Sequence, residues 1–287
     1  MTFMRSNNAV LALLSLLLAL AVSSRADQVA EKGRELFKKN QHSVVTVQEV
    51  LKMSASGSSR STESKQDLTG TVVDPSGLTV LALSACDPGE MYQRMVGEDY
   101  SRRVETEITD LKILLDDGSE VPAEIVLRDK DLDLAFIRPK IKLPAPMTAV
   151  DLSKSSPVQV LDEVVTLNRL NSAAGRAYAA SVERITAVIQ KPRTFYIPDS
   201  TMTSTTLGSP AFALDGNVVG LFVMRSVSNK GNSSRGYRDN MTSIILPADD
   251  ILKAAKQAPE AKGDTEKKDS KDAAAGDKPA SETKEAK

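Results

Sequence analysis

Short apolar runs separated by turn sequences dominate the chain between about residues 43 and 250. In three places two such runs flank a turn that combines Asp with Gly, which is a strong local signal for a β-hairpin. These turns are Asp74-Pro75-Ser76-Gly77, Asp116-Asp117-Gly118 and Asp215-Gly216-Asn217. The pattern therefore predicts a mainly β structure that is built from hairpins.

The other runs complete this β pattern. Ser43–Lys52 predicts a first strand, whereas residues 54–67 are polar and rich in Ser and Gly, which indicates a loop. Further strands are predicted over Val158–Val165, Ala180–Gln190, Thr194–Ile197 and Met241–Leu246. We expect one helix before the strands, over Asp27–Lys39, and one after them, over Pro247–Lys256, where Pro stands at a position that needs no N–H.

The two ends of the chain differ in composition from the rest. Arg5 precedes an apolar run, Ala9–Val22, and a small-x-small exit at Ser24–Ala26, the layout of a secretory signal peptide. The run is shorter than the roughly 20 residues of a membrane span. We therefore expect residues 1–26 to be removed and the mature protein, without a membrane span, to be exported to the periplasm or outside the cell; an uncleaved anchor is the alternative. Residues 257–287 are mostly Lys, Glu, Asp, Ala, Gly and Ser, which predicts a disordered charged tail.

Composition excludes several kinds of site. The chain has one cysteine, Cys86, and one histidine, His42, so we expect no intrachain disulfide, no metal centre and no cofactor. Aromatic residues make up 4% of the chain, Trp is absent and the formal net charge is -1, which argues against binding to nucleic acid. Any chemistry that requires an imidazole must use His42.

Three segments together resemble trypsin-like serine proteases of the HtrA/Deg type. Arg128–Arg138 reads R-D-K-D-L-D-L-A-F-I-R and is similar to the family's R-D-x-x-x-D-L-A segment. Leu214–Gly220 resembles the family's D-G-x-V-x-G segment, and Gly70–Leu81 resembles the hairpin that leads to its general base.

The resemblance implies an all-β fold of two six-stranded trypsin-like barrels, with a short N-terminal helix and a C-terminal helix. The implied boundaries are a helix at 27–42, a first barrel at 43–148 and a second at 149–256. We expect no PDZ domain after the second barrel, although most members of the family have one.

The resemblance also assigns the catalytic positions, and two of the three have lost the required chemistry. Aligning the hairpins places Ser84 on the histidine, Asp133 on the carboxylate and Leu207 on the nucleophilic serine. A leucine has no lone pair with which to attack a carbonyl, and an alcohol does not hold a proton as an imidazole does. The segment Thr205-Thr206-Leu207 replaces the family's G-N-S, which removes a glycine that helps to form the oxyanion hole. The protein is therefore expected to be catalytically inactive.

Three interpretations of the individual residues remain beside this one. Ser209, next to Gly208, is an alternative nucleophile, although a turn residue is its simpler role. His42 is an alternative base, although it precedes the first strand and also suits a surface position. Ser84 is expected to form a hydrogen bond with Asp133, which would satisfy a carboxylate that the fold retains.

The functional hypothesis is an exported pseudoprotease that binds a peptide or protein in the cleft between the barrels, or that acts as a scaffold, alone or in an oligomer with active relatives. An active serine-type hydrolase that uses rearranged residues is the competing class. A structural envelope protein, tethered by its charged tail, is a third.

Overall fold

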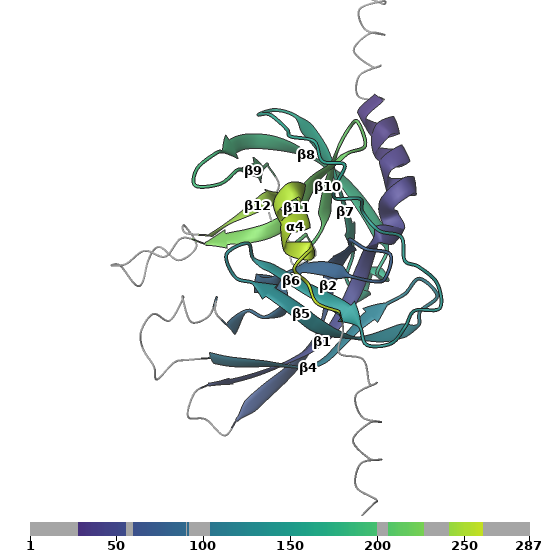
Figure 1. The fold of residues 1–287 in the computed structure, drawn as a ribbon, viewed down its shortest axis with the longest axis vertical. Helices are drawn as coiled ribbons and strands as arrows, with labels where there is room; N and C mark the ends of the chain where they lie inside the picture. The colour runs from purple at the N-terminus through teal and green to yellow at the C-terminus, as the bar shows by residue number, and fades with distance from the viewer. Residues whose placement is uncertain are drawn as a thin grey trace, which may run out of the picture.

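Two closed β-barrels make up most of the structure (Figure 1), a computed structural model that describes residues 28–55, 60–89, 91, 104–199, 206–226 and 241–260. The strand order is β1-β2-β3-β6-β5-β4 in the first barrel and β10-β11-β12-β9-β8-β7 in the second. Every neighbouring pair is antiparallel. The predicted all-β fold of two six-stranded barrels with a helix at each end is confirmed.

Each barrel is formed by six consecutive strands. Those of the first are β1 (Val44–Ala55), β2 (Ser61–Val72), β3 (Thr79–Ala82), β4 (Val104–Leu114), β5 (Glu120–Asp129) and β6 (Leu134–Pro139). Those of the second are β7 (Glu163–Arg169), β8 (Tyr178–Ile189), β9 (Phe195–Pro198), β10 (Pro210–Ala213), β11 (Val218–Ser226) and β12 (Met241–Pro247). The predicted Asp-Gly turns at Gly118 and Gly216 connect β4 to β5 and β10 to β11, and both glycines have positive φ.

Alternating side chains along the strands divide the apolar residues into three clusters. One cluster fills the first barrel, with Val47, Leu81 and Ile137 among its members. A second fills the other barrel, around Ile185 and Phe222. The largest cluster comes from the opposite faces of the same strands and contains residues of both barrels, so the barrels share a core: Val80, Ala82, Leu134, Phe136, Val165, Leu167, Phe212, Leu221, Val223, Ile244 and Leu246.

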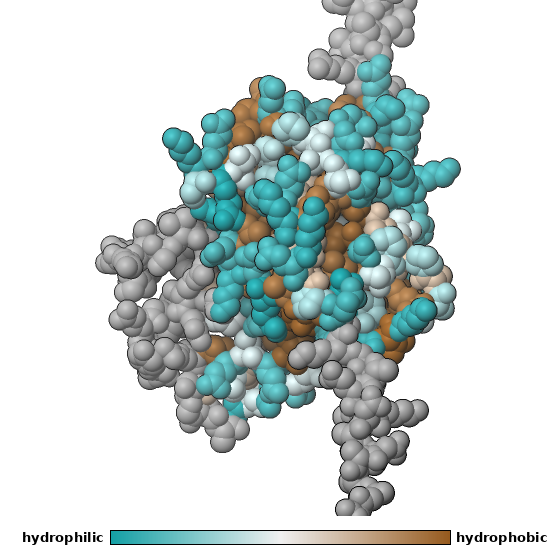
Figure 2. All heavy atoms as spheres, in the orientation of Figure 1, coloured by the Kyte–Doolittle hydropathy of each residue, from teal (hydrophilic) through white to brown (hydrophobic). Residues whose placement is uncertain are grey.

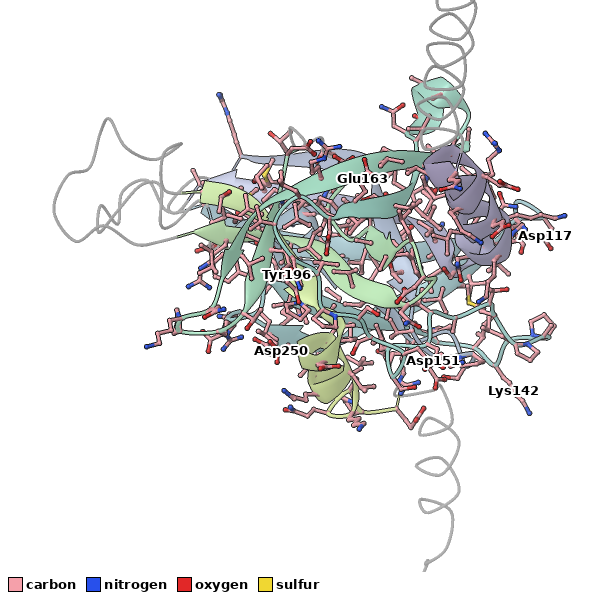
Figure 3. The ribbon with its side chains drawn as sticks, turned by 90° about the horizontal axis from the view of Figure 1, so that it is seen from above. Asp117, Lys142, Asp151, Glu163, Tyr196 and Asp250 are labelled. Carbon is pink, nitrogen blue, oxygen red and sulfur yellow. The ribbon has the colours of Figure 1, made fainter. Side chains whose placement is uncertain are left out.

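Two helices join the shared core. The helix over residues 28–40 contributes Leu36, which is 5% exposed, and its Gly33 faces Val165 of β7. The helix α4 (Ala248–Ala255) contributes the fully buried Ile251 and packs against β11 and β12. Viewed from above, the two helices lie on different sides of the molecule (Figure 3). Short helical turns occur at η1 (Gln41–Ser43), α2 (Leu83–Cys86) and η3 (Ser172–Ala174).

The prediction of a loop over residues 54–67 is wrong for most of that range. β1 continues to Ala55 and β2 begins at Ser61, and the two strands pair as far as Ser54↔Ser61. The outer half of β1 also pairs with β4, up to Ala55↔Val104. Side chains at the start of β2 are mostly exposed, so they give no apolar pattern. The backbone of this part of β2 is held by its pairing with β1.

Polar side chains cover most of the face seen in Figure 2, with small apolar areas between them. Charged residues such as Asp117 and Lys142 lie at the periphery (Figure 3). Within the described ranges, no helix is long and apolar enough to cross a membrane. The predicted signal peptide and residues 261–287 of the predicted tail lie outside the described residues.

Candidate ligand-binding site between the barrels

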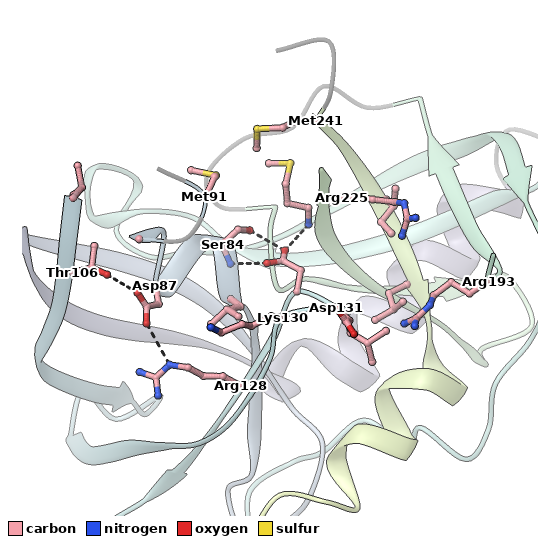
Figure 4. Close-up of a pocket in the computed structure, with 18 of the residues that line it drawn as sticks. Ser84, Asp87, Met91, Thr106, Arg128, Lys130, Asp131, Arg193, Arg225 and Met241 are labelled. Atoms are coloured by element: carbon pink, nitrogen blue, oxygen red, sulfur yellow. Dashed lines mark hydrogen bonds and ion pairs between the residues drawn. The ribbon is translucent and has the colours of Figure 1, made fainter. Parts of the chain in front are cut away.

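A cavity of about 660 Å³ lies where the two barrels meet (Figure 4). The first barrel lines it with α2, the beginning of β4, the end of β5 and the turn before β6. The second barrel lines it with the turn between β8 and β9, the end of β11 and part of β12. Ser84 and Asp133, the two first-barrel positions assigned from the sequence, both lie on its wall.

Asp133 is held by hydrogen bonds from both barrels. Its Oδ1 accepts from the backbone N–H of Ser84 at 2.7 Å, and its Oδ2 accepts from the Ser84 hydroxyl at 2.8 Å. Oδ2 also accepts from the backbone N–H of Met224 on β11 at 2.7 Å. Three donors stabilise an ionised carboxylate, and hydrogen bonds to a charged group are stronger than neutral ones. The expected bond between Ser84 and Asp133 is confirmed.

The local sequence explains why these groups meet. β3 pairs with β6 up to Ala82↔Leu134, which brings the start of α2 beside Asp133. The backbone N–H of Leu83 then donates to the Asp133 carbonyl at 2.9 Å. Asp133 has φ 58, a left-handed conformation that Asp tolerates better than most residues. This conformation and the β3–β6 ladder fix the carboxylate beside Ser84.

The pair formed by Ser84 and Asp133 contains no basic nitrogen. The Ser84 hydroxyl donates a hydrogen bond to the carboxylate of Asp133, so its proton is directed at that carboxylate and the group does not serve as a base. In a serine protease this carboxylate orients an imidazole, which takes the proton of the nucleophile. Here the carboxylate orients an alcohol and a strand backbone instead.

Leu207 lies in the shared core. It is 8% exposed and belongs to the apolar cluster that includes Ala82, two residues before Ser84, and Leu134, the residue after Asp133. It does not line the cavity. The first two residues assigned from the sequence are thus in direct contact at the cavity, whereas the third is packed beneath it.

The turn around Leu207 is fixed against the first barrel by Gly208. Gly208 has φ +85, and a Cβ at this position would lie 2.2 Å from the carbonyl oxygen of Thr69. The Thr71 hydroxyl donates to the Gly208 carbonyl at 2.7 Å in a fully buried bond. We call these contacts of Gly208, Thr69 and Thr71, with those of Asp133, Ser84 and Met224, the central junction.

Ser209 is fully buried, at 0% exposure, and does not line the cavity. Its backbone N–H donates to Thr206 O at 3.1 Å, and its carbonyl accepts from the N–H of Phe222 at 3.0 Å. The first bond closes the turn before β10, and the second attaches Ser209 to β11. Thr205, at the expected oxyanion position, lies outside the described residues.

β11 continues along the cavity beyond its pairing with β10. That pairing reaches Leu221, and Gly208 and Ser209 then bond to both backbone groups of Phe222. Because backbone groups two residues apart in a strand point to the same edge, those of Met224 and Ser226 point to the edge used by Phe222. Met224 lines the cavity there, and its N–H reaches Asp133. The edge of β11 after Phe222 therefore borders the cavity.

His42 belongs to a separate group, here called the peripheral cluster, which contains His42, Asp116, Arg169 and Tyr178. His42 Nδ1 lies 2.6 Å from Asp116 Oδ2, and the Tyr178 hydroxyl donates to the other oxygen of Asp116. The guanidinium of Arg169 stacks 3.9 Å from the centroid of the Tyr178 ring. Partial burial and the bond to Asp116 raise the pKa of Tyr178.

The peripheral cluster does not include Asp133. The carboxylate of Asp133 accepts hydrogen bonds from Ser84 and Met224, whereas His42 Nδ1 lies 2.6 Å from Asp116 Oδ2. The one imidazole of the chain is therefore paired with a different carboxylate from the one that the resemblance assigns to the triad.

A buried acid lies inside the first barrel. Glu49 is 0% exposed, its Oε1 accepts from Gln66 Nε2 at 3.0 Å, and its Oε2 has no hydrogen-bond partner among the described residues. Burial raises the pKa of Glu49 to about 8, an effect that the Gln66 bond opposes. Burial also raises the pKa of the nearby Cys86 thiol, which disfavours the reactive thiolate.

Several charged residues that line the cavity could not be predicted as site residues from the sequence. Asp87 accepts from the Thr106 hydroxyl at 2.7 Å and pairs with Arg128 at 3.3 Å. Arg193 and Arg225 lie on the wall of the second barrel (Figure 4). Sequence motifs gave no signal for these residues, because strands far apart in the chain bring them together. Within the described residues, no group of three or more His, Cys, Asp or Glu side chains is placed to hold a metal ion.

Comparisons with known proteins agree with this architecture. The sequence profile of the trypsin-like peptidase domain matches residues 36–221. Among solved structures, a serine endoprotease from Yersinia pestis is similar over 79% of this chain, with a TM-score of 0.51 and 11% sequence identity. This chain spans 66% of that protease, just under two thirds of its length, and the likeness concerns the fold alone. No match is found among curated protein sequences.

Proposed function

Because this chain belongs to the trypsin-like peptidase domain family, we propose that it is an exported, catalytically inactive member of that family that binds an extended peptide or protein segment between its barrels. One observation carries the proposal. At the position of the general base, Ser84 donates a hydrogen bond to the retained carboxylate of Asp133. The carboxylate is thus used to hold the two barrels together and not to orient a base.

The proposed inactivity rests on chemistry at each assigned position. Acyl transfer by this family requires an attacking oxygen and a nitrogen that accepts its proton. Leu207 supplies a buried aliphatic side chain, and Ser84 supplies a second alcohol. His42, which has the required chemistry, pairs with Asp116 in the peripheral cluster.

The proposed peptide binding rests on the edge of β11 that borders the cavity after Phe222. An extended peptide binds readily to an exposed strand edge, because backbone hydrogen bonds provide affinity and pockets for alternate side chains provide specificity. Met224 lines the cavity, and its neighbour Arg225 does so as well. A cavity of about 660 Å³ is large enough for side chains of such a peptide.

A labelling experiment tests the inactivity. Purified protein without residues 1–26 is incubated with a fluorophosphonate probe and, separately, with casein, and an active trypsin-like protease serves as the positive control. We expect neither labelling nor turnover. Labelling at a serine would overturn the proposal, and turnover that Ser209→Ala abolishes would establish the rearranged hydrolase instead.

The proposed export rests on the N-terminal sequence, in which Arg5 precedes the apolar run Ala9–Val22. Expression of the full chain in a secretion-competent cell, followed by fractionation and N-terminal sequencing, tests it. We expect a mature protein that begins near Asp27 outside the cytoplasm. Full-length protein retained in the cytoplasm would contradict this part of the proposal and leave the binding site unaffected.

A further inference from the structure

The two barrels contribute different chemistry to the cavity. On the wall of the second barrel, the only ionisable side chains among the described lining residues are Arg193 and Arg225. The rest of this wall is apolar and includes Met224, Met241 and Ile244. The wall is therefore cationic and apolar at once.

Two carboxylates of the first-barrel wall already bind donors of the protein itself. Asp133 accepts three hydrogen bonds, and Asp87 is shared between Thr106 and Arg128. Glu105 and Asp131 also line this wall and leave it with an excess of negative charge over Arg128 and Lys130. The two walls therefore differ in sign.

The two arginines of the opposite wall have no carboxylate partner among the described residues. Arg225 stacks on the ring of Phe195, with its Cζ 4.8 Å from the ring centroid, and Phe195 is 6% exposed. Such stacking holds a guanidinium in place and leaves its N–H groups free for an anion. Arg193 stands two residues before Phe195, on the turn between β8 and β9, and lines the same wall (Figure 4).

We propose that the cavity selects extended peptides with an acidic side chain that pairs with Arg193 and Arg225, flanked by apolar residues that contact the methionines. This inference rests on the proposed peptide binding and adds the chemical class of the ligand. Charge complementarity places one carboxylate of the peptide on the wall of the second barrel. Glu105 and Asp131 repel carboxylates on the other side, so a uniformly acidic segment is disfavoured. Methionine side chains adapt to apolar residues of different shape.

Fluorescence anisotropy with short labelled peptides tests the inference. In three otherwise identical valine-rich peptides, a single central position carries glutamate, glutamine or lysine. We expect the glutamate peptide to bind at least about tenfold more tightly than the glutamine peptide, and the lysine peptide to bind most weakly. Added salt should reduce the preference for glutamate.

Variants of the two arginines show whether the preference arises at this wall. The double variant Arg193→Gln/Arg225→Gln should lose the preference for glutamate, and Arg193→Glu/Arg225→Glu should favour the lysine peptide. Arg34→Gln, on the exposed surface of the N-terminal helix, is the matched control and should behave like the wild type. Unfolding midpoints establish that each variant is folded.

The possible results separate this inference from the proposed function. Equal binding of the glutamate and glutamine peptides, or a preference that survives both arginine substitutions, would overturn the charge selection and leave peptide binding in place. Binding of none of the three peptides by the folded wild-type protein would overturn peptide binding itself, and the charge selection with it.

Discussion

The central junction and the peripheral cluster both connect the barrels, but the hydrogen bonds of the first are buried or partly buried, whereas those of the second are exposed. In the central junction, Thr71 and Gly208 meet in a fully buried hydrogen bond, and Asp133 receives a backbone N–H from each barrel. In the peripheral cluster, the side chains of His42 and Asp116 are 48% and 52% exposed. Burial removes competing water, so loss of a partner is costly in the first region and inexpensive in the second.

The two regions also differ in the kinds of side chain that they bring together. A histidine, an aspartate and a hydroxyl still lie together, but they do so in the peripheral cluster, where the hydroxyl is the weakly acidic phenol of Tyr178. At the central junction, Asp133 is bonded to the hydroxyl and backbone N–H of Ser84 and to the backbone N–H of Met224 in the second barrel, and no imidazole takes part.

Gly208→Ala should have the largest effect on the central junction. The new methyl group would meet the Thr69 carbonyl at 2.2 Å, and φ +85 is unfavourable for alanine. We expect a loss of about 4 kcal/mol in the free energy of unfolding, measured by urea denaturation. Gly118→Ala is the control, because it has a similar φ but open space around it. Equal losses for both variants would show that backbone conformation alone, and not contact between the barrels, explains the effect.

Asp133→Ala should have the next largest effect. It leaves the backbone N–H groups of Ser84 and Met224 without their acceptor, and we expect a loss of about 3 kcal/mol in the same measurement. Asp133→Asn should lose less, because its carbonyl oxygen still accepts and Asn tolerates a positive φ. A change as small as that of Asp131→Ala, on the same cavity wall, would contradict the role assigned to Asp133.

Glu49→Gln should change how the free energy of unfolding depends on pH, because Glu49 is a fully buried acid. Because the folded-state pKa is raised to about 8 from an ordinary value of 4.5, the folded protein retains a proton that the unfolded chain releases. The stability of the wild type should therefore fall as pH rises from about 4.5 to about 8. The variant lacks this loss, so its stability relative to the wild type should rise over that window, by at most about 1.4 kcal/mol per pH unit. A difference between the proteins that does not change with pH would contradict the assignment.

Asp116→Asn should have the smallest effect, because it weakens an exposed cluster. We expect the free energy of unfolding to fall by about 1 kcal/mol or less, and high salt to reduce the difference from the wild type. A loss comparable to that of Asp133→Ala would show that the peripheral cluster holds the barrels together as strongly as the central junction does.

Local sequence determined most of the strands. Asp-Gly turns between apolar runs predicted hairpins at Gly118 and Gly216, and both glycines have the positive φ that such turns require. The prediction failed at Ser61–Asp67, where exposed polar side chains gave no alternation although every residue pairs with β1. Alternation reports which side chains are buried, and it is silent about a strand with both faces in water.

For the candidate site too, the sequence determines one part and the tertiary structure decides the other. Sequence alone determined the residue types, and therefore that the matched positions carry an alcohol, a carboxylate and an aliphatic side chain in Ser84, Asp133 and Leu207. Only the tertiary structure decided that Asp133 bonds to Met224, that His42 pairs with Asp116, and that two arginines face the cavity. Residue types are fixed locally by the chain, whereas these partners depend on how two barrels, each closed by its own strands, pack across a shared core.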